Sequence, residues 1–416
     1  MINLAAEIAQ QLPAELVDFM QTAGEMTDEQ GQNMYLVGGV VRDLLLRRAN
    51  FDLDLVVEGD AIKLALRLVD ISQGKIITHP RFRTAKIQWH KWSVDLASAR
   101  SETYARPGAL PSVKPGAIGM DLGRRDFTIN AMAIELIPGR YGQLIDPYRG
   151  RTDLKAKLIR ILHERSFIDD ATRIWRALRY EQRLDFQLEA DTLQLLKRDI
   201  PMLDTISGDR IRHELEAVLK EEFPEKILCR ADELGVLAKL HPSLKGDDWL
   251  VEKFRQSRSA GLALSALYLA LLAYRLTDAE SEELISYLKL PKSLAQTLLD
   301  SHSLKTKLGM LAKFDMAPSR IYHLLHGYSP SAIIANSLAS DSPVVQQHIR
   351  LFLDKLRYVK SALTGNDLQR MGIDPGPQMK EILQRLLEAR LDGKVTSKKG
   401  EEGLVRGWVD KEKQVI

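Results

Sequence analysis

The segment Leu36-Val-Gly-Gly-Val-Val-Arg-Asp-Leu-Leu45 is followed, after a short polar stretch, by Asn50-Phe-Asp-Leu-Asp-Leu-Val-Val57. The first segment has the pattern of a strand, a glycine turn and a helix, and the second is an apolar strand that carries two acids. Because alternate side chains of a strand point to the same face, Asp52 and Asp54 are predicted to lie side by side.

Two neighbouring carboxylates repel each other and raise each other's pKa unless a cation lies between them. Mg²⁺ is usually held by one or two carboxylates together with substrate phosphates. Gly38 and Gly39 would let backbone N–H groups approach a triphosphate, and Arg42 would donate to phosphate oxygens. The structural alternative is a tight turn beside two solvated acids, but the combination of both segments favours a nucleotide site with Mg²⁺ held by Asp52 and Asp54.

The segments Gly38-Gly39-Val-Val-Arg42-Asp43 and Asp52-Leu-Asp54 resemble the first motif of the class II tRNA nucleotidyltransferases and bacterial poly(A) polymerases. The resemblance implies an α+β fold, in which a polymerase-beta-like nucleotidyltransferase head with a mixed sheet precedes an all-helical neck, body and tail. The predicted domains are the catalytic head (1–150), the neck that recognises the nucleobase (151–220), the body (221–345) and a tail that binds tRNA (346–416).

Composition limits the other classes of protein. The chain has 416 residues, a formal net charge of +3 and one cysteine, so no disulfide can form within it. The start of the chain lacks the charged and apolar regions of a signal peptide, and the longest apolar stretch, 261–274, is too short to span a bilayer. A cytoplasmic location and no membrane association are therefore predicted.

The hydrophobic pattern predicts mixed α/β structure in the first 100 residues. An amphipathic helix is expected up to about residue 30, with one apolar face formed by Ile8, Leu12, Leu16 and Met20. Further helices are expected at 41–48 and 60–69, and further strands at 34–37, 75–78, 82–89 and 92–98.

Asp95 lies among apolar residues of the last of these strands, where a buried acid is costly without a partner. An edge position and a salt bridge to Arg100 are the structural alternatives. The functional interpretation is a third catalytic carboxylate, either a metal ligand or a base for an attacking hydroxyl, and the resemblance implies the same for Asp95.

Residues 100–120 are rich in glycine and proline and predict a long loop. It resembles the flexible loop that remodels the pocket of this family between nucleotides. A surface excursion is the structural alternative.

The segment that runs from Asp121 through Arg124-Arg125-Asp126 to Asn130 resembles the second motif of the family. Arg125 is predicted to bind the triphosphate, and Asp126 and Asn130 are predicted to complete the nucleotide site. The structural alternative is a salt-bridged helix start that Asp126 caps.

One helix is predicted over 167–180, with Asp170, Arg173, Arg176 and Arg179 on one face. Ion pairs on a solvated helix are the structural alternative. The resemblance implies that Asp170 and Arg173 read the base of CTP or ATP, as the Glu-Asp-x-x-Arg motif of the family does, although Asp169 replaces the Glu. Arg176 and Arg179 are predicted to support these base readers within the nucleotide site.

Beyond residue 222 the pattern is helical, and the scattered histidines show no metal-ligand spacing. The segment 206–216 resembles the fifth motif of the family and is interpreted as scaffold.

The predicted function is the template-independent addition of nucleotides, CCA or part of it, to the 3′ end of tRNA. The predicted partners are the tRNA 3′ end, CTP and ATP, and the sequence indicates no obligate protein partner. An enzyme that adds only A or only CC, and a poly(A) polymerase, are alternatives within the family. A non-catalytic RNA-binding protein is the alternative from another class.

Overall fold

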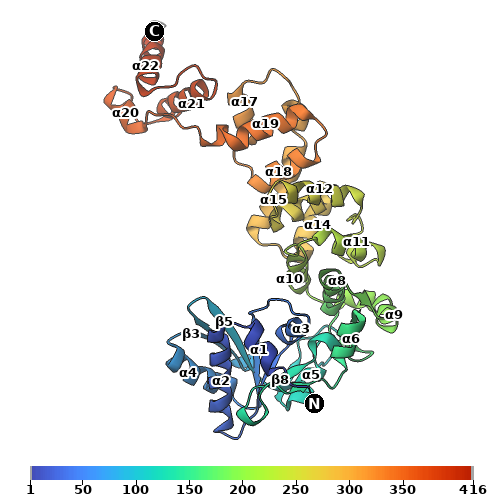
Figure 1. The fold of residues 1–416 in the computed structure, drawn as a ribbon. Coiled ribbons are helices and arrows are strands. Elements are labelled where there is room, and N and C mark those ends of the chain that lie inside the picture. Colours follow the sequence, from blue (N-terminus) through green and yellow to red (C-terminus); the bar gives the residue numbers. More distant parts are fainter. Residues whose placement is uncertain (1, 414–416) are drawn as a thin grey trace. The chain divides into compact units, whose positions relative to one another are not determined.

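The computed structural model describes residues 2–413, with side chains described through residue 409. The chain divides into two compact units, residues 1–239 and 240–416, and each is described by itself (Figure 1). The finer division at residues 150, 220 and 345 stays a prediction.

A seven-stranded mixed sheet is the centre of the first unit. The strands are ordered β3-β4-β5-β2-β1-β8-β9, and only the β2–β5 pair is parallel. Their bounds are β1 (Met34–Val37), β2 (Leu53–Val57), β3 (Lys75–His79), β4 (Thr84–Trp89), β5 (Trp92–Ser98), β8 (Ala133–Glu135) and β9 (Leu144–Ile145). The prediction of a mixed sheet is confirmed.

The two faces of this sheet differ in what covers them. Helix α2 (Ala14–Asp28) packs on β1 and α4 (Ala61–Ser72) packs on β3, β4 and β5, and Figure 1 draws both on one side. On the other side, Val37 and Val56 pack against Leu122 of the short helix α5 (Ile118–Gly123). Because Asp54 is two residues from Val56, its side chain lies on this second face.

The N-terminal helical region is two helices and not the single predicted one. Pro13 separates α1 (Ala5–Gln11) from α2, because proline cannot donate the backbone hydrogen bond that a continuous helix needs. The predicted apolar face is confirmed, since all four of its residues are buried, namely Ile8, Leu12, Leu16 and Met20.

Helix α3 (Gly39–Leu45) begins two residues earlier than predicted, directly after Gly38. Gly38 has φ 78°, a conformation that glycine adopts without strain. Helix α4 is capped by Asp60, whose side chain accepts from the backbone N–H groups of Ile62 and Lys63.

The predicted long loop after Arg100 is wrong in part, because it contains a β-hairpin. β6 (Arg100–Thr103) pairs antiparallel with β7 (Ser112–Pro115), and α5 follows. The glycine and proline content of this stretch reflects its turn, and the backbone pairing between strands eight residues apart was not visible in local periodicity.

The remainder of the first unit is helical apart from β10 (Leu158–Ile159) and β11 (Gln187–Leu188), which pair in parallel. The helices are α6 (Gly150–Ala156), α7 (Ser166–Asp169), α8 (Thr172–Leu184), α9 (Ala190–Asp199), α10 (Gly208–Val218) and α11 (Pro224–Glu233). The single helix predicted over 167–180 is wrong, because Asp170 is extended between α7 and α8. Its carboxylate accepts from the Thr172 backbone N–H, which stabilises the break.

The second unit is built from helices alone among the residues described. They are α12 (Asp248–Ser259), α13 (Ser265–Ala273), α14 (Asp278–Leu288), α15 (Lys292–Lys305), α16 (Leu308–Leu311), α17 (Pro318–Leu325), α18 (Pro330–Ala339), α19 (Pro343–Asp354), α20 (Gly365–Arg370), α21 (Pro377–Leu391) and α22 (Lys398–Lys413). Helix α18 packs on α13 and α15, α17 packs on α19 and α21, and α20 to α22 enclose a separate apolar cluster.

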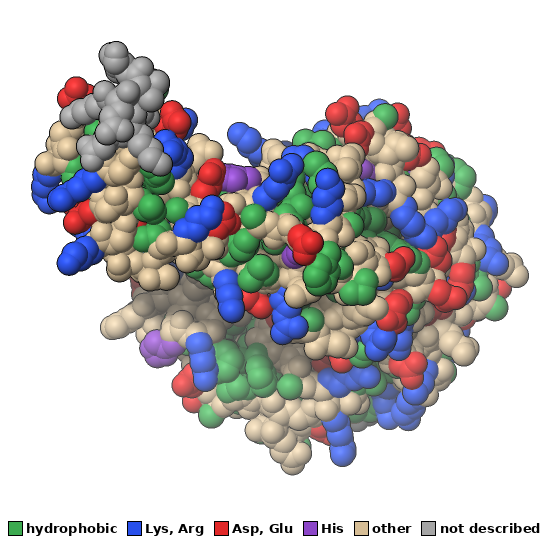
Figure 2. Space-filling view, turned by 90° about the horizontal axis from the view of Figure 1, so that it is seen from above, with side chains coloured by type: hydrophobic (Ala, Val, Ile, Leu, Met, Phe, Trp, Pro, Cys, Tyr) green, Lys and Arg blue, Asp and Glu red, His purple; other side chains and the backbone are tan. Residues whose placement is uncertain are grey.

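Across the described residues, no helix has the length and apolar character needed to cross a bilayer. On the face drawn in Figure 2, Lys and Arg side chains lie interspersed with Asp and Glu, in keeping with the small net charge.

Candidate active site

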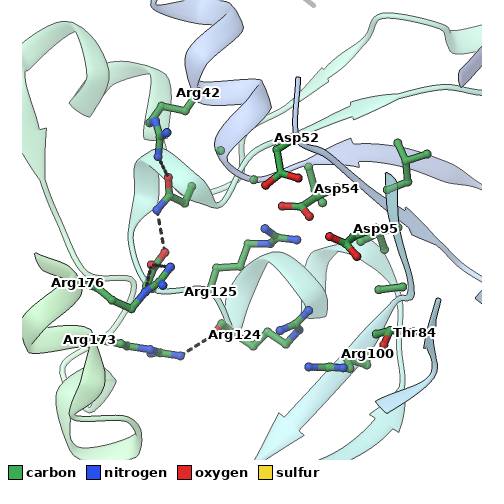
Figure 3. Close-up of a pocket in the computed structure, with 18 of the residues that line it drawn as sticks. Arg42, Asp52, Asp54, Thr84, Asp95, Arg100, Arg124, Arg125, Arg173 and Arg176 are labelled. Atoms are coloured by element: carbon green, nitrogen blue, oxygen red, sulfur yellow. Dashed lines mark hydrogen bonds and ion pairs between the residues drawn. The ribbon is translucent and has the colours of Figure 1, made fainter. Parts of the chain in front are cut away.

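A cavity of about 800 Å³ opens in the first unit, on the face of the sheet that carries Asp54. Twelve of the thirteen predicted site residues line it, namely Gly38, Gly39, Arg42, Asp52, Asp54, Asp95, Arg125, Asp126, Asn130, Asp170, Arg173 and Arg176. They come from β2, β5, α3, the segment after α5, and the α7–α8 region (Figure 3).

Three acids point toward one another at one side of the cavity (Figure 3). Asp54 of β2 and Asp95 of β5 are register partners on parallel strands, and Asp52 directly precedes β2. Burial raises the pKa of Asp54 to about 6, Arg125 opposes the shift, and the charges of Asp52 and Asp95 add to it. Burial and the two neighbouring acids therefore disfavour the ionised form of Asp54.

A divalent cation fits this donor set. Carboxylate oxygens are the ligands that Mg²⁺ prefers, and a bound cation would offset the burial and the neighbouring acids that raise the pKa of Asp54. The described residues contain no preassembled group of three His, Cys, Asp or Glu side chains that would enclose a metal ion. A cation held here by Asp52 and Asp54 would need further oxygen ligands, and substrate phosphates supply them.

Gly38 lies between the acids and a guanidinium. A Cβ atom at this position would be 2.9 Å from Nη1 of Arg125 and 3.3 Å from Oδ2 of Asp54. Arg125 is held from the other side by Asp121, whose Oδ2 accepts from Nη2 at 3.1 Å. The absence of a side chain at Gly38 thus allows Arg125 to approach Asp54 across the glycine turn.

Arg42 lines the cavity, but protein groups already bind much of its guanidinium. Nε and Nη2 donate to the carboxylate of Asp43, and Nη1 donates to Oδ1 of Asn130 at 2.7 Å. The residue is 2% exposed, and its guanidinium lies over the ring of Tyr180. These contacts connect α3 to the segment after α5 and orient both Arg42 and Asn130.

Asp126 is buried and fully engaged. Its Oδ1 accepts from the Asn130 amide and the Phe127 backbone N–H, and its Oδ2 accepts from Arg176 at 2.6 Å. Burial opposes the ionisation of Asp126, but the Arg176 charge and the bonds from Asn130 and Arg176 outweigh it and hold the pKa at about 2. The ionised Asp126 therefore connects the segment after α5, which lines the cavity, to α8.

Asp170 and Arg173, the two predicted base readers, are positioned by different contacts. Oδ1 of Asp170 accepts from the Thr172 hydroxyl and from Nη2 of Arg210 at 2.9 Å. Arg173 donates through Nη1 to the Ser166 hydroxyl and through Nη2 to the Arg124 carbonyl oxygen. Both side chains are held in one orientation, which is the condition for reading a base edge without a template.

Arg179 is the predicted site residue that does not line the cavity. It forms ion pairs with Glu214 of α10 and with Glu221, at 3.7 Å and 3.5 Å. The sequence pattern placed Arg179 on the face of Arg173 and Arg176. Residues three apart on an α-helix are rotated by about 60° from each other about the helix axis. Arg179 is two such steps from Arg173 and is therefore turned away from the cavity.

Several lining residues were not among the predicted site residues, namely Asn50, Thr84, Arg100, Glu102, Tyr104, Arg124, Tyr180 and Arg183. Glu102 of β6 is central among them, because Arg100 and Arg124 both bind its Oε1 and Tyr104 donates to its Oε2. The hairpin supplies Glu102 and Tyr104, so the expectation of a loop hid them. Arg124 was visible as a neighbour of Arg125, and Thr84 left no signal.

The chain matches two family models. The Poly A polymerase head domain model matches residues 34–160, and the model of the probable RNA and SrmB-binding site of polymerase A matches residues 185–247. The first match contains Asp52, Asp54, Asp95 and Arg125.

Curated relatives agree with these models. An A-adding tRNA nucleotidyltransferase of Geobacter sulfurreducens is 35% identical over 94% of this chain, which spans 47% of that protein's length. An A-adding tRNA nucleotidyltransferase of Halalkalibacterium halodurans is 33% identical over 92% of this chain and 90% of its own.

Solved structures support the same relationship. An apo CCA-adding enzyme is 32% identical, with a TM-score of 0.81 over 98% of this chain and 99% of its own. The Thermotoga maritima CCA-adding enzyme complexed with tRNA is 31% identical, with a TM-score of 0.76 over the same shares. With these relatives, and with the acid cluster, the glycine turn and the predicted base readers gathered in one cavity, the chain belongs to the class II tRNA nucleotidyltransferase and poly(A) polymerase family.

Proposed function

We propose that this chain extends the 3′ end of tRNA without a template, using ATP or CTP and releasing pyrophosphate. One observation carries the proposal: Asp52, Asp54 and Asp95 converge in the cavity that Arg125, Asp170 and Arg173 also line. A reacting phosphate and a base edge can therefore be held at the same time by groups on fixed elements.

Arg125 and the glycine turn bind the triphosphate in this proposal. The Arg125 guanidinium lies within 3 Å of where a Gly38 side chain would begin, so both groups face the same space. The Gly39 backbone N–H approaches phosphate oxygens without steric hindrance, and Arg125 adds a planar cation. Arg42, Asp126, Asn130 and Arg176 form the bonded floor that keeps this side of the cavity rigid.

Asp52 and Asp54 hold Mg²⁺ in the proposed active state. The bound ion would stabilise negative charge on the α-phosphate and lower the pKa of the attacking hydroxyl. A carboxylate oxygen of Asp95 accepts the proton of the RNA 3′ hydroxyl. The 3′ oxygen forms a bond to the α-phosphorus, and the bond to the β-phosphate oxygen breaks as pyrophosphate leaves.

Asp170 and Arg173 select the base. Carboxylate oxygens accept from the exocyclic amine that adenine and cytosine share, and a guanidinium donates to their ring acceptors. Guanine and uracil present a carbonyl at the equivalent position, whose oxygen cannot donate to the Asp170 oxygens.

Within this activity we infer that the chain adds the terminal A to a tRNA that already ends in CC. The inference is supported by three relatives named A-adding, which are 33–35% identical over 85–94% of this chain. Full CCA addition is the second candidate, and it is favoured by solved CCA-adding enzymes that match 98% of this chain.

Three tRNA transcripts test both candidates, one ending at the discriminator base, one after a single C and one after CC. Each is incubated with Mg²⁺ and ATP, CTP or both. Extension of the CC transcript alone, by one A, is the expected result, and completion of all three would establish CCA addition. Runs of A on any RNA would indicate a poly(A) polymerase, and no extension would favour an RNA-binding protein.

Asp52→Ala tests whether the acid cluster is needed for extension. It should remove all extension while the far-UV circular dichroism spectrum stays that of the parent, because Asp52 is exposed and precedes β2. Metal-dependent extension by this variant would contradict the assignment.

A further inference from the structure

Lys86 lies in line with the catalytic acids across three neighbouring strands. Lys86 of β4 is the register partner of Asp95 of β5, and Asp95 is the register partner of Asp54 of β2. Directly opposed residues of neighbouring strands point to the same face of a sheet. The order across this face is therefore Lys86, Asp95, Asp54.

A direct bond connects the first two members of this row. Nζ of Lys86 donates to Oδ2 of Asp95 at 2.9 Å. Asp95 lines the cavity, so Lys86 is bonded directly to one of the cavity acids. The bond occupies Oδ2 and leaves Oδ1 to the reacting groups.

The charge of Lys86 also acts on the rest of the cluster. Asp95 and Asp54 are register partners on neighbouring strands, so the ammonium bonded to Asp95 lies beside the acids that would hold a divalent cation. A positive charge at this place repels a second cation that approaches the cluster. Lys86 is thus a fixed positive charge next to the proposed metal ligands.

We propose that Lys86 is a positioning residue for nucleotide addition, which fixes the Asp95 carboxylate and opposes the binding of divalent cations to the empty acid cluster. The catalytic part of this inference rests on the proposed function, and the cation part does not. A weakened affinity for free cations favours the arrival of the metal together with the nucleotide, because triphosphate oxygens then supply the missing negative charge.

If Lys86 served only to stabilise the fold, its loss should lower the melting temperature and leave cation binding unchanged. The side chains of Lys86 and Asp95 are 36% and 44% exposed, and an ion pair this exposed contributes little to the free energy of folding. Loss of Lys86 should therefore leave the melting temperature nearly unchanged while it alters cation binding and catalysis.

The first test measures Mn²⁺ binding to the full chain by electron paramagnetic resonance, without nucleotide or RNA. Lys86→Met should bind Mn²⁺ about three- to tenfold more tightly, because a positive charge near the ion is removed from a partly solvated site. Lys86→Arg should bind as the parent does, and so should Lys75→Met, which removes an exposed lysine of the same sheet on β3. Asp54→Asn should weaken binding and thereby assign it to the cluster. Unchanged or weaker binding by Lys86→Met would overturn the proposal.

The second test is a double-mutant cycle on extension of the CC transcript. Lys86→Met should lower kcat about tenfold with little change in the KM for ATP, since Lys86 acts through Asp95 and does not reach the nucleotide. In an Asp95→Asn background the same substitution should cause no further loss, and additive losses would contradict action through Asp95. Lys86→Arg should restore kcat. If the parent extends no RNA, the proposed function fails, and the Mn²⁺ measurement still decides the role of Lys86 at the cluster.

Discussion

Arg176 donates to Asp126, with 2.6 Å between Nη2 and Oδ2, so two side chains that were each predicted to bind nucleotide bind each other. The pair connects α8 to the segment that follows α5. It also explains how the cationic face of α8 is tolerated, because Arg176 has Asp126 as its anion and Arg179 has Glu214 and Glu221.

The main effect of Arg176→Gln should therefore be a lower stability of the fold and not a direct loss of catalysis. The substitution leaves the Asp126 charge buried without its main partner, at an expected cost of about 2 kcal/mol in the free energy of unfolding. We expect less than the cost for a wholly buried pair, because 32% of the Arg176 side chain is exposed. Urea unfolding at pH 7 measures the difference.

The pH dependence of this loss has a definite sign. The pKa of Asp126 is lowered to about 2, so the stabilisation by the ion pair is present above the ordinary value of 3.8 and is lost as pH falls toward 2. The difference between parent and Arg176→Gln should shrink over this range. Arg183→Gln, whose side chain is 46% exposed, is the control and should change stability by less than about 0.5 kcal/mol.

Asp54→Asn should abolish extension and yet stabilise the metal-free chain at neutral pH. Burial raises the pKa of Asp54 to about 6, so its ionised form is less favourable in the folded chain than in the unfolded one. The free energy of unfolding of the parent is therefore lowered by this group as pH rises from about 4 to 6.

The amide has the shape of the acid without its charge, so the gain at pH 7.5 should be about 2 kcal/mol and should vanish near pH 4. Thermal unfolding in EDTA at both pH values measures it. An equal difference at the two pH values would show that Asp54 is not the group responsible.

Arg210→Met should weaken selection of the base. Arg210 donates to Asp170 at 2.9 Å and to the Gly108 carbonyl oxygen at 3.3 Å, and so orients a predicted base reader from α10. Loss of a charged hydrogen bond of this kind predicts a decrease of about tenfold in kcat/KM for ATP.

Discrimination between ATP and GTP should decrease in the same variant, because Asp170 then samples several orientations. Arg210→Lys keeps the charge but cannot bind both oxygens at once, and its kinetic constants should lie between those of parent and Arg210→Met. A loss of ATP turnover with discrimination intact would refute the orienting role of Arg210.

Gly24→Ala should destabilise the first unit strongly, whereas Gly119→Ala should not. A Cβ atom on Gly24 of α2 would lie 2.1 Å from the carbonyl oxygen of Leu136, directly after β8, so α2 and this segment would have to separate. Nothing lies within 4 Å of the corresponding position on Gly119 in α5, where alanine is the better helix former. We expect a loss of about 3 kcal/mol for Gly24→Ala and a gain below about 1 kcal/mol for Gly119→Ala, both from urea unfolding.

The acids Asp52 and Asp54, the glycine turn and the segment with Asp170 and Arg173 could be recognised as cavity residues from sequence because each is a local pattern. Alternation along the predicted strand places Asp52 and Asp54 on one face, and the glycine pair marks the turn before α3. Asp95 was predicted with less support from the chain itself, since only the resemblance connected it to the other two acids.

Contacts between segments distant in sequence could not be predicted in this way. Lys86 reaches Asp95 only because β4 and β5 pair in one particular register, and Arg210 reaches Asp170 only because α10 packs on α8. The hairpin of β6 and β7 was expected as a loop for the same reason, since its strands are stabilised by each other and by the bonds to Glu102.

Local sequence patterns were sufficient to recognise the family, because the residue types at the turn, beside β2 and before α8 can be read from the chain without its fold. Which charges face the cavity and which neutralise one another depended on how the elements pack. Arg173 lines the cavity while Arg179 pairs with Glu214, although both lie on one helix. Periodicity places side chains relative to their own helix or strand, whereas the partner of a charge depends on what packs against that element.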